Sequence, residues 1–352
     1  MSRIRVAVNG YGVIGKRVAD AVRLMPDMEL VGVADVGTDW RVRTAIGLGF
    51  PVFTAAADAA AAMRSAGIAV AGDLATLLGQ ADVVVDCTPK KVAASNLETY
   101  RAAGVKAVFQ GGESHSLTGH SFVAQANYGT ALGRDATRVV SCNTTSMVRV
   151  LGALQDAGLL ARARGVLIRR ATDPGESHEG GIMNTMVPES SIPSHQGPDA
   201  RTVRPELDVL TMAARASHTQ THNHYWTLQL TRPATREEVL DALRSAPRIA
   251  FISMGDGLTG LNTTVELMRD LGRPRGDMWE VALWEDVLTV EGDEAFLTYQ
   301  VYNEAIVVPE SIDAIRALAG TVPDGAASIA MTDEALGMRR HFLPDPVGVT
   351  PV

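Results

Sequence analysis

The chain has 352 residues, a length that predicts two domains rather than one hydrophobic core. Its 46% hydrophobic and 20% charged residues are typical of a soluble globular protein. A net charge of −8 argues against nucleic acid or an anionic membrane as the main partner. Two cysteines are too few for a disulfide framework, and the sequence shows neither a signal-peptide pattern nor an apolar run long enough to span a bilayer. We therefore expect a cytoplasmic protein.

The first part of the chain alternates short apolar strands with helical segments. Strands are expected at residues 4–8, 30–34, 83–86 and 105–109, and helices at 15–25, 55–63 and 93–103. This order predicts a doubly wound (Rossmann) parallel sheet with helices on both faces, an α/β domain that we assign to residues 1–141.

The pattern changes in the second part of the chain. A helix is expected at residues 143–160, and strands at 166–170, 225–230, 249–254, 281–284 and 295–301. Residues 173–198, rich in Pro, Gly, Ser and His, are expected to form a long functional loop. We predict a second, α+β catalytic domain with a mainly antiparallel sheet at 142–302. Residues 303–352, with a helix at 311–319, are predicted to pack back on the first domain.

The first expected strand leads into a glycine-rich turn of the G-x-G-x-x-G type. Gly10 permits the tight turn, Gly12 lets the backbone approach a pyrophosphate, and Gly15 lets the next helix pack closely. Val13 and Ile14 complete the turn and lead into that helix, whose N-terminus attracts phosphate. The motif and its flanking elements predict that the domain binds a dinucleotide.

Asp35 follows the second expected strand, roughly 20 residues after the last glycine of the motif. A carboxylate there accepts hydrogen bonds from a ribose 2′-OH and repels a 2′-phosphate, which favours NAD. Arg41 and Arg43 are close enough in sequence to leave NADP possible. The alternative is an ordinary turn aspartate.

Cys142 stands where an apolar strand ends and a helix is expected to begin. The unpaired N–H groups and dipole of a helix N-terminus lower a thiol's pKa and favour the nucleophilic thiolate. Taken alone, a free cysteine is more often a small core residue. In a dinucleotide-binding protein, a nucleophilic thiol predicts oxidation of an aldehyde through a covalent thioester.

Motifs over nearly the whole chain, up to about Ala319, resemble those of the archaeal-type (type II) phosphorylating glyceraldehyde-3-phosphate dehydrogenases. They are VNGYGVIGKRVADA at 8–21, DCTP at 86–89, FQGGE at 109–113, VSCNTT at 140–145, RR with DP at 169–174, PSH at 193–195, GPD at 197–199, the histidines at 222 and 224, and VPE at 308–310. The resemblance implies a homotetramer that carries out NAD(P)-dependent phosphorylating oxidation of D-glyceraldehyde 3-phosphate to 1,3-bisphosphoglycerate. Its small-molecule partners would be this phosphorylated aldehyde and inorganic phosphate.

The same resemblance assigns roles to individual residues. Cys142 is the expected nucleophile, and His222 is the general base that takes the hydroxyl proton as hydride leaves. The implied substrate-binding residues are Ser141, Asn143, Thr144, Arg169, His195 and Gln196, and the cofactor-binding residues include Gly112, Arg170 and Asn303. On sequence alone, His222 and His224 would share one face of a strand as a metal pair or as structural residues. We find no third ligand and predict no metal.

Departures from the family pattern keep other functions open. Residues 177–181 lack the family's lysine and place Glu179 in a presumed phosphate neighbourhood, and Asn303 takes the place of a glutamine. The alternatives are a related aldehyde dehydrogenase or a semialdehyde or acyl-phosphate reductase with another substrate, and a non-catalytic dinucleotide-binding sensor. The presence of both Cys142 and His222 counts against the sensor.

Overall fold

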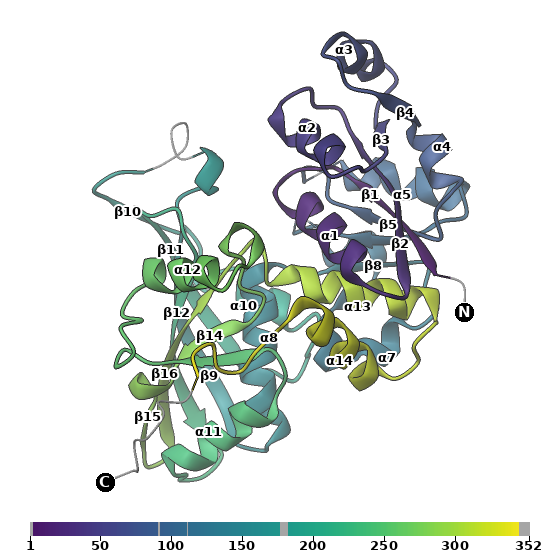
Figure 1. Cartoon of the computed structure of the whole chain (residues 1–352). Coiled ribbons are helices and arrows are strands. Elements are labelled where there is room, and N and C mark those ends of the chain that lie inside the picture. Colours follow the sequence, from purple (N-terminus) through teal and green to yellow (C-terminus); the bar gives the residue numbers. More distant parts are fainter. Residues whose placement is uncertain (1–2, 91, 111, 177–181, 345–352) are drawn as a thin grey trace. The chain divides into compact units, whose positions relative to one another are not determined.

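The computed structural model describes residues 3–90, 92–110, 112–176 and 182–344 (Figure 1). Its contacts divide the chain into two units. The first unit comprises Met1–Val148, Asp199–Pro205 and Asn303–Gly337, and the second comprises Arg149–Pro198, Glu206–Tyr302 and Met338–Val352. The segment expected as 303–352 is therefore shared between the units, and a short piece around residue 200 belongs to the first.

A parallel sheet forms the centre of the first unit, in the strand order β4-β3-β2-β1-β5-β6-β8-β7. The strands are β1 (Ile4–Asn9), β2 (Met28–Asp35), β3 (Val52–Thr54), β4 (Val70–Asp73), β5 (Val83–Asp86), β6 (Lys106–Phe109), β7 (Ser121–Phe122) and β8 (Ala136–Val139). Consecutive residues Val6, Ala7 and Val8 are all fully buried, which requires that both faces of the sheet be covered. The expected doubly wound α/β fold is confirmed.

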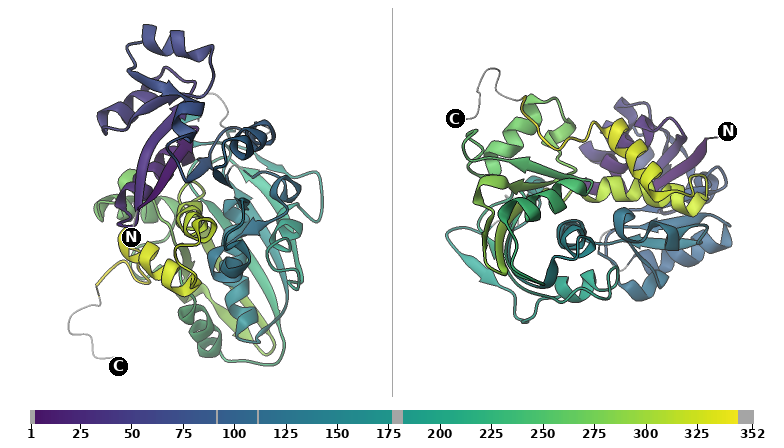
Figure 2. Two further views of the ribbon diagram at one scale, coloured as in Figure 1. Left: turned by 90° about the vertical axis from the view of Figure 1, so that its right-hand side faces the viewer. Right: turned by 90° about the horizontal axis from the view of Figure 1, so that it is seen from below.

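Helices cover this sheet on both sides (Figure 2). They are α1 (Val13–Leu24), α2 (Trp40–Gly47), α3 (Ala59–Ser65), α4 (Leu74–Leu78), α5 (Ala93–Ala102), α6 (His115–Thr118), α7 (Ala124–Ala131), α13 (Val307–Ala319) and α14 (Gly325–Leu336). Helix α13 is buried along nearly its whole length. Its Arg316 is fully buried and pairs with Asp27 at 2.7 Å between Nε and Oδ2, which ties the C-terminal helices to the loop before β2.

One local expectation for this unit was wrong in detail. The alanine-rich helix begins at Ala59 rather than Ala55, because the Ala55 N–H donates to the Asp35 carbonyl at 2.9 Å and extends the sheet ladder past β3. Strand β4 was not predicted. It is short and its residues are half-buried or exposed, so it lacks the apolar signal that revealed the central strands.

The second unit contains a mixed sheet in the order β10-β11-β9-β12-β16-β14-β13, with β15 paired to β16. Its strands are β9 (Leu160–Arg169), β10 (Met186–Pro188), β11 (Val209–Ala216), β12 (His222–Leu230), β13 (Ile249–Ile252), β14 (Val281–Trp284), β15 (Thr289–Glu291) and β16 (Glu294–Val301). Most neighbours are antiparallel, while β11 with β9 and β13 with β14 are parallel. The expected second domain with a mainly antiparallel sheet is confirmed.

The remaining helices are α8 (Cys142–Asp156), α10 (Gln196–Ala200), α11 (Arg236–Ser245) and α12 (Leu261–Asp270). Helix α8 ends at Asp156 and β9 begins at Leu160, so the helix expected up to residue 160 is shorter. Strand β11 was missed because its Ala-Ala-Arg-Ala ending favours a helix by propensity, although its burial alternates along the first residues.

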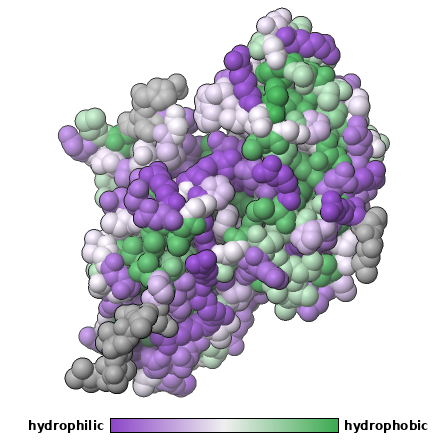
Figure 3. All heavy atoms as spheres, viewed as in Figure 1, coloured by the Kyte–Doolittle hydropathy of each residue, from purple (hydrophilic) through white to green (hydrophobic). Residues whose placement is uncertain are grey.

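None of the helices in the described part of the chain is both long and apolar enough to cross a membrane. On the face drawn in Figure 3, hydrophilic side chains are interspersed with apolar patches.

Candidate active site

The turn between β1 and α1 has the geometry that a dinucleotide requires. Gly10 has φ +91°, a value unfavourable for other residues, and a Cβ on Gly15 would lie 1.8 Å from the Gly10 carbonyl oxygen. Gly12 precedes α1, and an added Cβ there would meet nothing within 4 Å. No described side chain caps this helix, so its first N–H groups are directed to a ligand or solvent.

A cavity of about 580 Å³ lies at the carboxyl ends of β1, β2 and β5. This is where the strand order reverses, with β2 on one side of β1 and β5 on the other, the usual dinucleotide position in such sheets. Its lining includes Asn9, Gly12, Asp35 and Pro89. Asn9 Oδ1 is buried and has no hydrogen-bond partner among the described residues, a cost that a bound polar group would relieve. The residues present therefore fit a dinucleotide.

The Asp35 carboxylate binds its own loop. Oδ2 accepts from the Tyr11 N–H at 2.6 Å, and Oδ1 accepts from the N–H groups of Val36 and Gly37, each at 2.7 Å. A carboxylate has about four acceptor positions, so the carboxylate can shape the turn and still accept from a ribose hydroxyl. The hydrogen bonds of Asp35 to its own turn are therefore observed, and its binding of a cofactor ribose stays a prediction.

Arg41, which was expected to leave NADP possible, has a carboxylate partner. Its Nη2 lies 2.6 Å from Asp39 Oδ2, and the hydrogen bond from Arg41 lowers the pKa of Asp39. Asp39 also caps α2 by accepting from the Arg41 N–H at 2.9 Å. Arg43 Nη2 donates to the Ala66 carbonyl at 3.1 Å.

Cys142 is the first residue of α8 and is partly buried. Strand β8 ends three residues earlier, so the expected strand-to-helix junction is present. The Ser141 hydroxyl accepts from the Thr144 N–H at 3.3 Å, as an N-cap residue does, and the first turn contains no acidic residue. Asn143 and Thr144 are buried.

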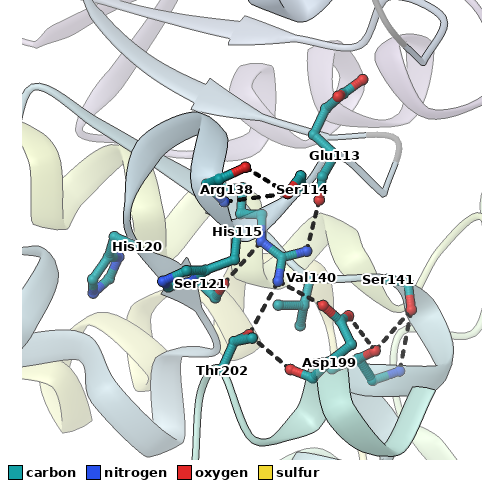
Figure 4. A network of polar contacts seen from close by, with 12 residues as sticks. Glu113, Ser114, His115, His120, Ser121, Arg138, Val140, Ser141, Asp199 and Thr202 are labelled. Carbon is teal, nitrogen blue, oxygen red and sulfur yellow. Dashed lines mark hydrogen bonds and ion pairs between the residues drawn. The ribbon is translucent and has the colours of Figure 1, made fainter. Parts of the chain in front are cut away.

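A buried ion pair that the sequence analysis did not find supports this junction (Figure 4). Arg138 of β8 places Nη2 2.6 Å from Asp199 Oδ1, and Thr144 Oγ1 donates to Asp199 Oδ2 at 2.7 Å. Asp199 had been noted only as part of a motif, and no local pattern links it to Arg138. Among the other predicted residues of the first unit, Gly112 follows β6 with φ +74°, and Asn303 follows β16.

The histidines of β12 belong to the second unit. His222 is buried, and its Nδ1 accepts from the Arg170 N–H at 3.0 Å, so a neutral ring carries its proton on Nε2. Burial, and then the charge of Arg170, hold the pKa of His222 well below its usual value. His224 is fully buried, with Nδ1 3.0 Å from Tyr299 Oη, and burial lowers its pKa to about 3.

Both arginines at the end of β9 have carboxylate partners. Arg169 pairs with Glu189, and Arg170 pairs with Asp173. His195 Nδ1 also lies 3.5 Å from Glu189 Oε2, so two predicted substrate-binding residues share one carboxylate. Residues 177–181, including Glu179, lie outside the described residues.

Gln196 is fully buried, and its side-chain amide has no hydrogen-bond partner among the described residues. An unsatisfied buried amide is costly, and a ligand would relieve the cost. The described residues contain no group of three side chains that could hold a metal ion.

The predicted site residues thus form two sets, one on each unit. The first unit carries Gly10, Gly12, Val13, Ile14, Gly15, Asp35, Gly112, Ser141, Cys142, Asn143, Thr144 and Asn303. The second carries Arg169, Arg170, His195, Gln196 and His222.

A dinucleotide cradle and a cysteine at a helix N-terminus, in a chain with a second, mixed-sheet unit, define a dinucleotide-dependent oxidoreductase. Residues 4–112 match the family described as dihydrodipicolinate reductase, N-terminus, and residues 141–269 match glyceraldehyde 3-phosphate dehydrogenase, C-terminal domain. The cofactor of this chain is a nicotinamide dinucleotide.

Whole-chain relatives define the family more narrowly. The chain is 45% identical to a glyceraldehyde-3-phosphate dehydrogenase of Methanococcoides burtonii, over 96% of this chain and 100% of that protein. It is 46% identical to one of Pyrobaculum calidifontis, over 95% and 97% of the two chains, and 42% identical to one of Methanobrevibacter smithii, over 95% and 99%. The chain belongs to the glyceraldehyde-3-phosphate dehydrogenase family.

The hydrogen bond to His222 predicts its protonation state. We expect ¹⁵N NMR of histidine-labelled protein to show the Nε2–H tautomer at neutral pH, with no titration of His222 around its ordinary pKa of about 6.5. His222→Asn, which removes one signal set, assigns the resonances. Because the folded pKa lies below the unfolded one, the unfolded chain binds the extra proton, and His222 lowers the free energy of unfolding as pH falls below about 6.5. An Nδ1–H tautomer, or titration near 6.5, would contradict this geometry.

Proposed function

We propose that the chain catalyses the NAD(P)-dependent, phosphorylating oxidation of D-glyceraldehyde 3-phosphate to 1,3-bisphosphoglycerate. The observation that carries the proposal is Cys142 at the N-terminus of α8 in a dinucleotide-binding unit of this family. Neither a sensor nor a structural protein requires a thiol at a strand-to-helix junction.

In the proposed reaction, the Cys142 thiolate attacks the aldehyde carbon and forms a C–S bond, which leaves negative charge on the aldehyde oxygen. The N–H groups at the start of α8 are suited to stabilise this oxyanion. The bound nicotinamide ring supplies a hydride acceptor. Loss of hydride converts the hemithioacetal on Cys142 into a thioester. An oxygen of inorganic phosphate then attacks the thioester carbonyl, the C–S bond breaks, and Cys142 leaves as the thiolate.

We assign proton handling to His222, which its lowered pKa keeps neutral at physiological pH. With Nδ1 engaged by the Arg170 N–H, the resting ring offers an Nε2–H, which can donate to the substrate oxygen. To act as the general base through Nε2, the ring must move its proton to Nδ1 and give up the bond from Arg170. The base role therefore requires a tautomer change during the reaction.

We propose that Arg169, His195 and Gln196 hold the anionic groups of the substrate, and that Ser141, Asn143 and Thr144 form the turn around the nucleophile. The unpaired amide of Gln196 supports a ligand there. Glu189 already pairs with Arg169, so an arriving phosphate has to compete with or displace that carboxylate. We therefore expect phosphate to saturate the enzyme at a high concentration.

The direct test mixes the protein with NAD, D-glyceraldehyde 3-phosphate and inorganic phosphate, and follows NADH by absorbance. We expect turnover that depends on phosphate and disappears in Cys142→Ser, because serine is a far weaker nucleophile than a thiolate. Equal turnover without phosphate would mean hydrolysis of the thioester instead. Cofactor binding without turnover on this or other aldehydes would favour the sensor, and turnover of another aldehyde alone would favour the related dehydrogenase or reductase.

We propose that NAD is preferred to NADP, because Asp35 ends β2 at the ribose position and Asp39 neutralises Arg41. In Asp39→Asn, asparagine still caps α2 but no longer neutralises Arg41. We expect kcat/KM for NADP to rise several-fold, on the order of 1 kcal/mol, with little change for NAD. Asp73→Asn, which changes the N-cap of α4 in the same way, is the matched control. A wild-type preference for NADP, or no gain in Asp39→Asn, would contradict the assignment.

We also propose a homotetramer, for which the outer face of the second unit's sheet offers support. Val166, Met212, Tyr225 and Thr298 lie side by side on β9, β11, β12 and β16, and the first three are exposed apolar residues. They line a groove of about 590 Å³. Light scattering should give about four times the chain mass of 37.3 kDa, and Tyr225→Arg should lower it. A monomer in the wild type would reject the proposal. The cytoplasmic location stays a prediction.

A further inference from the structure

The buried guanidinium of Arg138 connects four parts of the first unit. It is 2% exposed, and Nε donates to Ser121 Oγ at 2.8 Å while Nη1 donates to the Glu113 carbonyl at 2.8 Å. Nη2 donates to Asp199 Oδ1 at 2.6 Å and to Thr202 Oγ1 at 3.0 Å (Figure 4). Four of its five N–H groups are used, and Asp199 balances its charge.

The second carboxylate oxygen of Asp199 is hydrogen-bonded to the turn that contains Cys142. Thr144 Oγ1 donates its proton to Asp199 Oδ2 at 2.7 Å. A hydroxyl has one proton, so in the 2.9 Å contact with Ser141 Oγ it is Thr144 that accepts and Ser141 that donates. Ser141 Oγ in turn accepts from the Thr144 N–H at 3.3 Å. The hydroxyl protons therefore run from Ser141 through Thr144 to Asp199, across the turn that contains Cys142.

This direction changes the role expected for Thr144. Its side chain is fully buried, and its hydroxyl proton is already donated to Asp199. The side chain therefore has no proton to give to a substrate oxygen. The contacts fit a residue that fixes the turn better than a residue that binds substrate.

We propose that Asp199, held by Arg138, is a positioning residue for Cys142: its carboxylate fixes the Ser141–Thr144 turn that contains the thiol, and the ion pair balances the charge bound to that turn. The proposal rests on the function proposed above only in taking Cys142 as the nucleophile. Asp199 and Arg138 act through the turn and are not assigned contact with substrate.

Because the two charges have opposite signs, we expect the loss of each to shift the pKa of the Cys142 thiol in the opposite direction. Asp199→Asn leaves the Arg138 cation uncompensated, which favours the Cys142 thiolate. Arg138→Met leaves the Asp199 carboxylate uncompensated, which disfavours the thiolate. If the ion pair only stabilised the fold, removing Asp199 and removing Arg138 would not shift the pKa of the Cys142 thiol in opposite directions.

The experiment measures the rate at which iodoacetamide alkylates Cys142 as a function of pH, with the modified residue located by mass spectrometry. Burial raises the pKa of the Cys87 thiol well above its usual value, which keeps the second cysteine slow. We expect the midpoint of the alkylation profile to fall in Asp199→Asn and to rise in Arg138→Met, each by on the order of half a pH unit. In both variants kcat should fall on the order of 10- to 100-fold, because the nucleophile is misplaced, with KM for NAD within about twofold.

Charge-preserving and hydroxyl-deleting variants separate geometry from charge. In Arg138→Lys we expect an unchanged midpoint of the alkylation profile and a lower kcat, since lysine keeps the charge but cannot bind the same partners. Thr144→Val should also keep the midpoint and lose kcat, with KM for phosphate unchanged. Thr144→Val makes the smallest change to the network, so it also serves if Arg138→Met fails to fold.

Asp82→Asn is the matched control. Asp82 forms an ion pair with Arg5 at 2.6 Å in the same unit, but beside the amino ends of β1 and β5, whereas Cys142 follows the carboxyl end of β8. This control should change neither the midpoint nor kcat.

Midpoints that move in the same direction in Asp199→Asn and Arg138→Met, or kcat retained in Asp199→Asn and Thr144→Val, would overturn the proposal. Alkylation requires no substrate. A protein that is alkylated as expected but fails to oxidise D-glyceraldehyde 3-phosphate would therefore refute the proposed substrate and still support the positioning role.

Discussion

The chemistry of the first unit depends on one constraint: its strands run parallel, so every strand-to-helix turn opens at the same edge of the sheet. The turn after β1 offers the uncapped N–H groups of α1 to a phosphate, and the turn after β8 places Cys142 at the start of α8. Asp35 ends β2 and Gly112 follows β6 at the same edge. The proposed function therefore uses a helix N-terminus twice in this unit, that of α1 for a phosphate and that of α8 for the Cys142 thiolate.

Charge pairing is the second constraint on the site. Four arginines of the site each face a carboxylate: Arg41 with Asp39, Arg138 with Asp199, Arg169 with Glu189, and Arg170 with Asp173. In the pair of Arg138 and Asp199, the arginine side chain is 2% exposed and the aspartate 20%, so losing Asp199 would leave a buried cation uncompensated. The more exposed pairs can exchange partners at lower cost, which suits residues that receive anionic ligands. Arg138 is the least exposed of the four arginine side chains, which fits the positioning role that we propose for its ion pair.

The sequence predicted those features that have a local signal. The glycine turn and the strand-to-helix junction at Cys142 each depend on a few consecutive residues, and the central strands are short apolar runs. The fold and the candidate nucleophile could therefore be predicted from sequence pattern and family resemblance. The Arg138–Asp199 pair joins residues 61 positions apart, and the hydrogen bond that sets the His222 tautomer joins residues 52 apart. Neither has a periodic or motif signal, because each depends on which segments the sheets bring together.

Cys142 and His222, the two groups that we propose to react, are held by different contacts, each within its own unit. In the first unit, Cys142 begins a helix whose first turn is hydrogen-bonded to the Arg138–Asp199 pair, while in the second, burial and the backbone N–H of Arg170 set the state of His222. Since β9 and β12 are paired strands, the Arg170 amide and the His222 ring keep their register through the sheet's ladder. Reactivity of the thiol toward a small alkylating agent and the tautomer of the histidine are therefore separate properties of separate units. A loss of turnover can then be traced to one unit or the other, because a defect in the His222 tautomer leaves the alkylation profile of Cys142 unchanged.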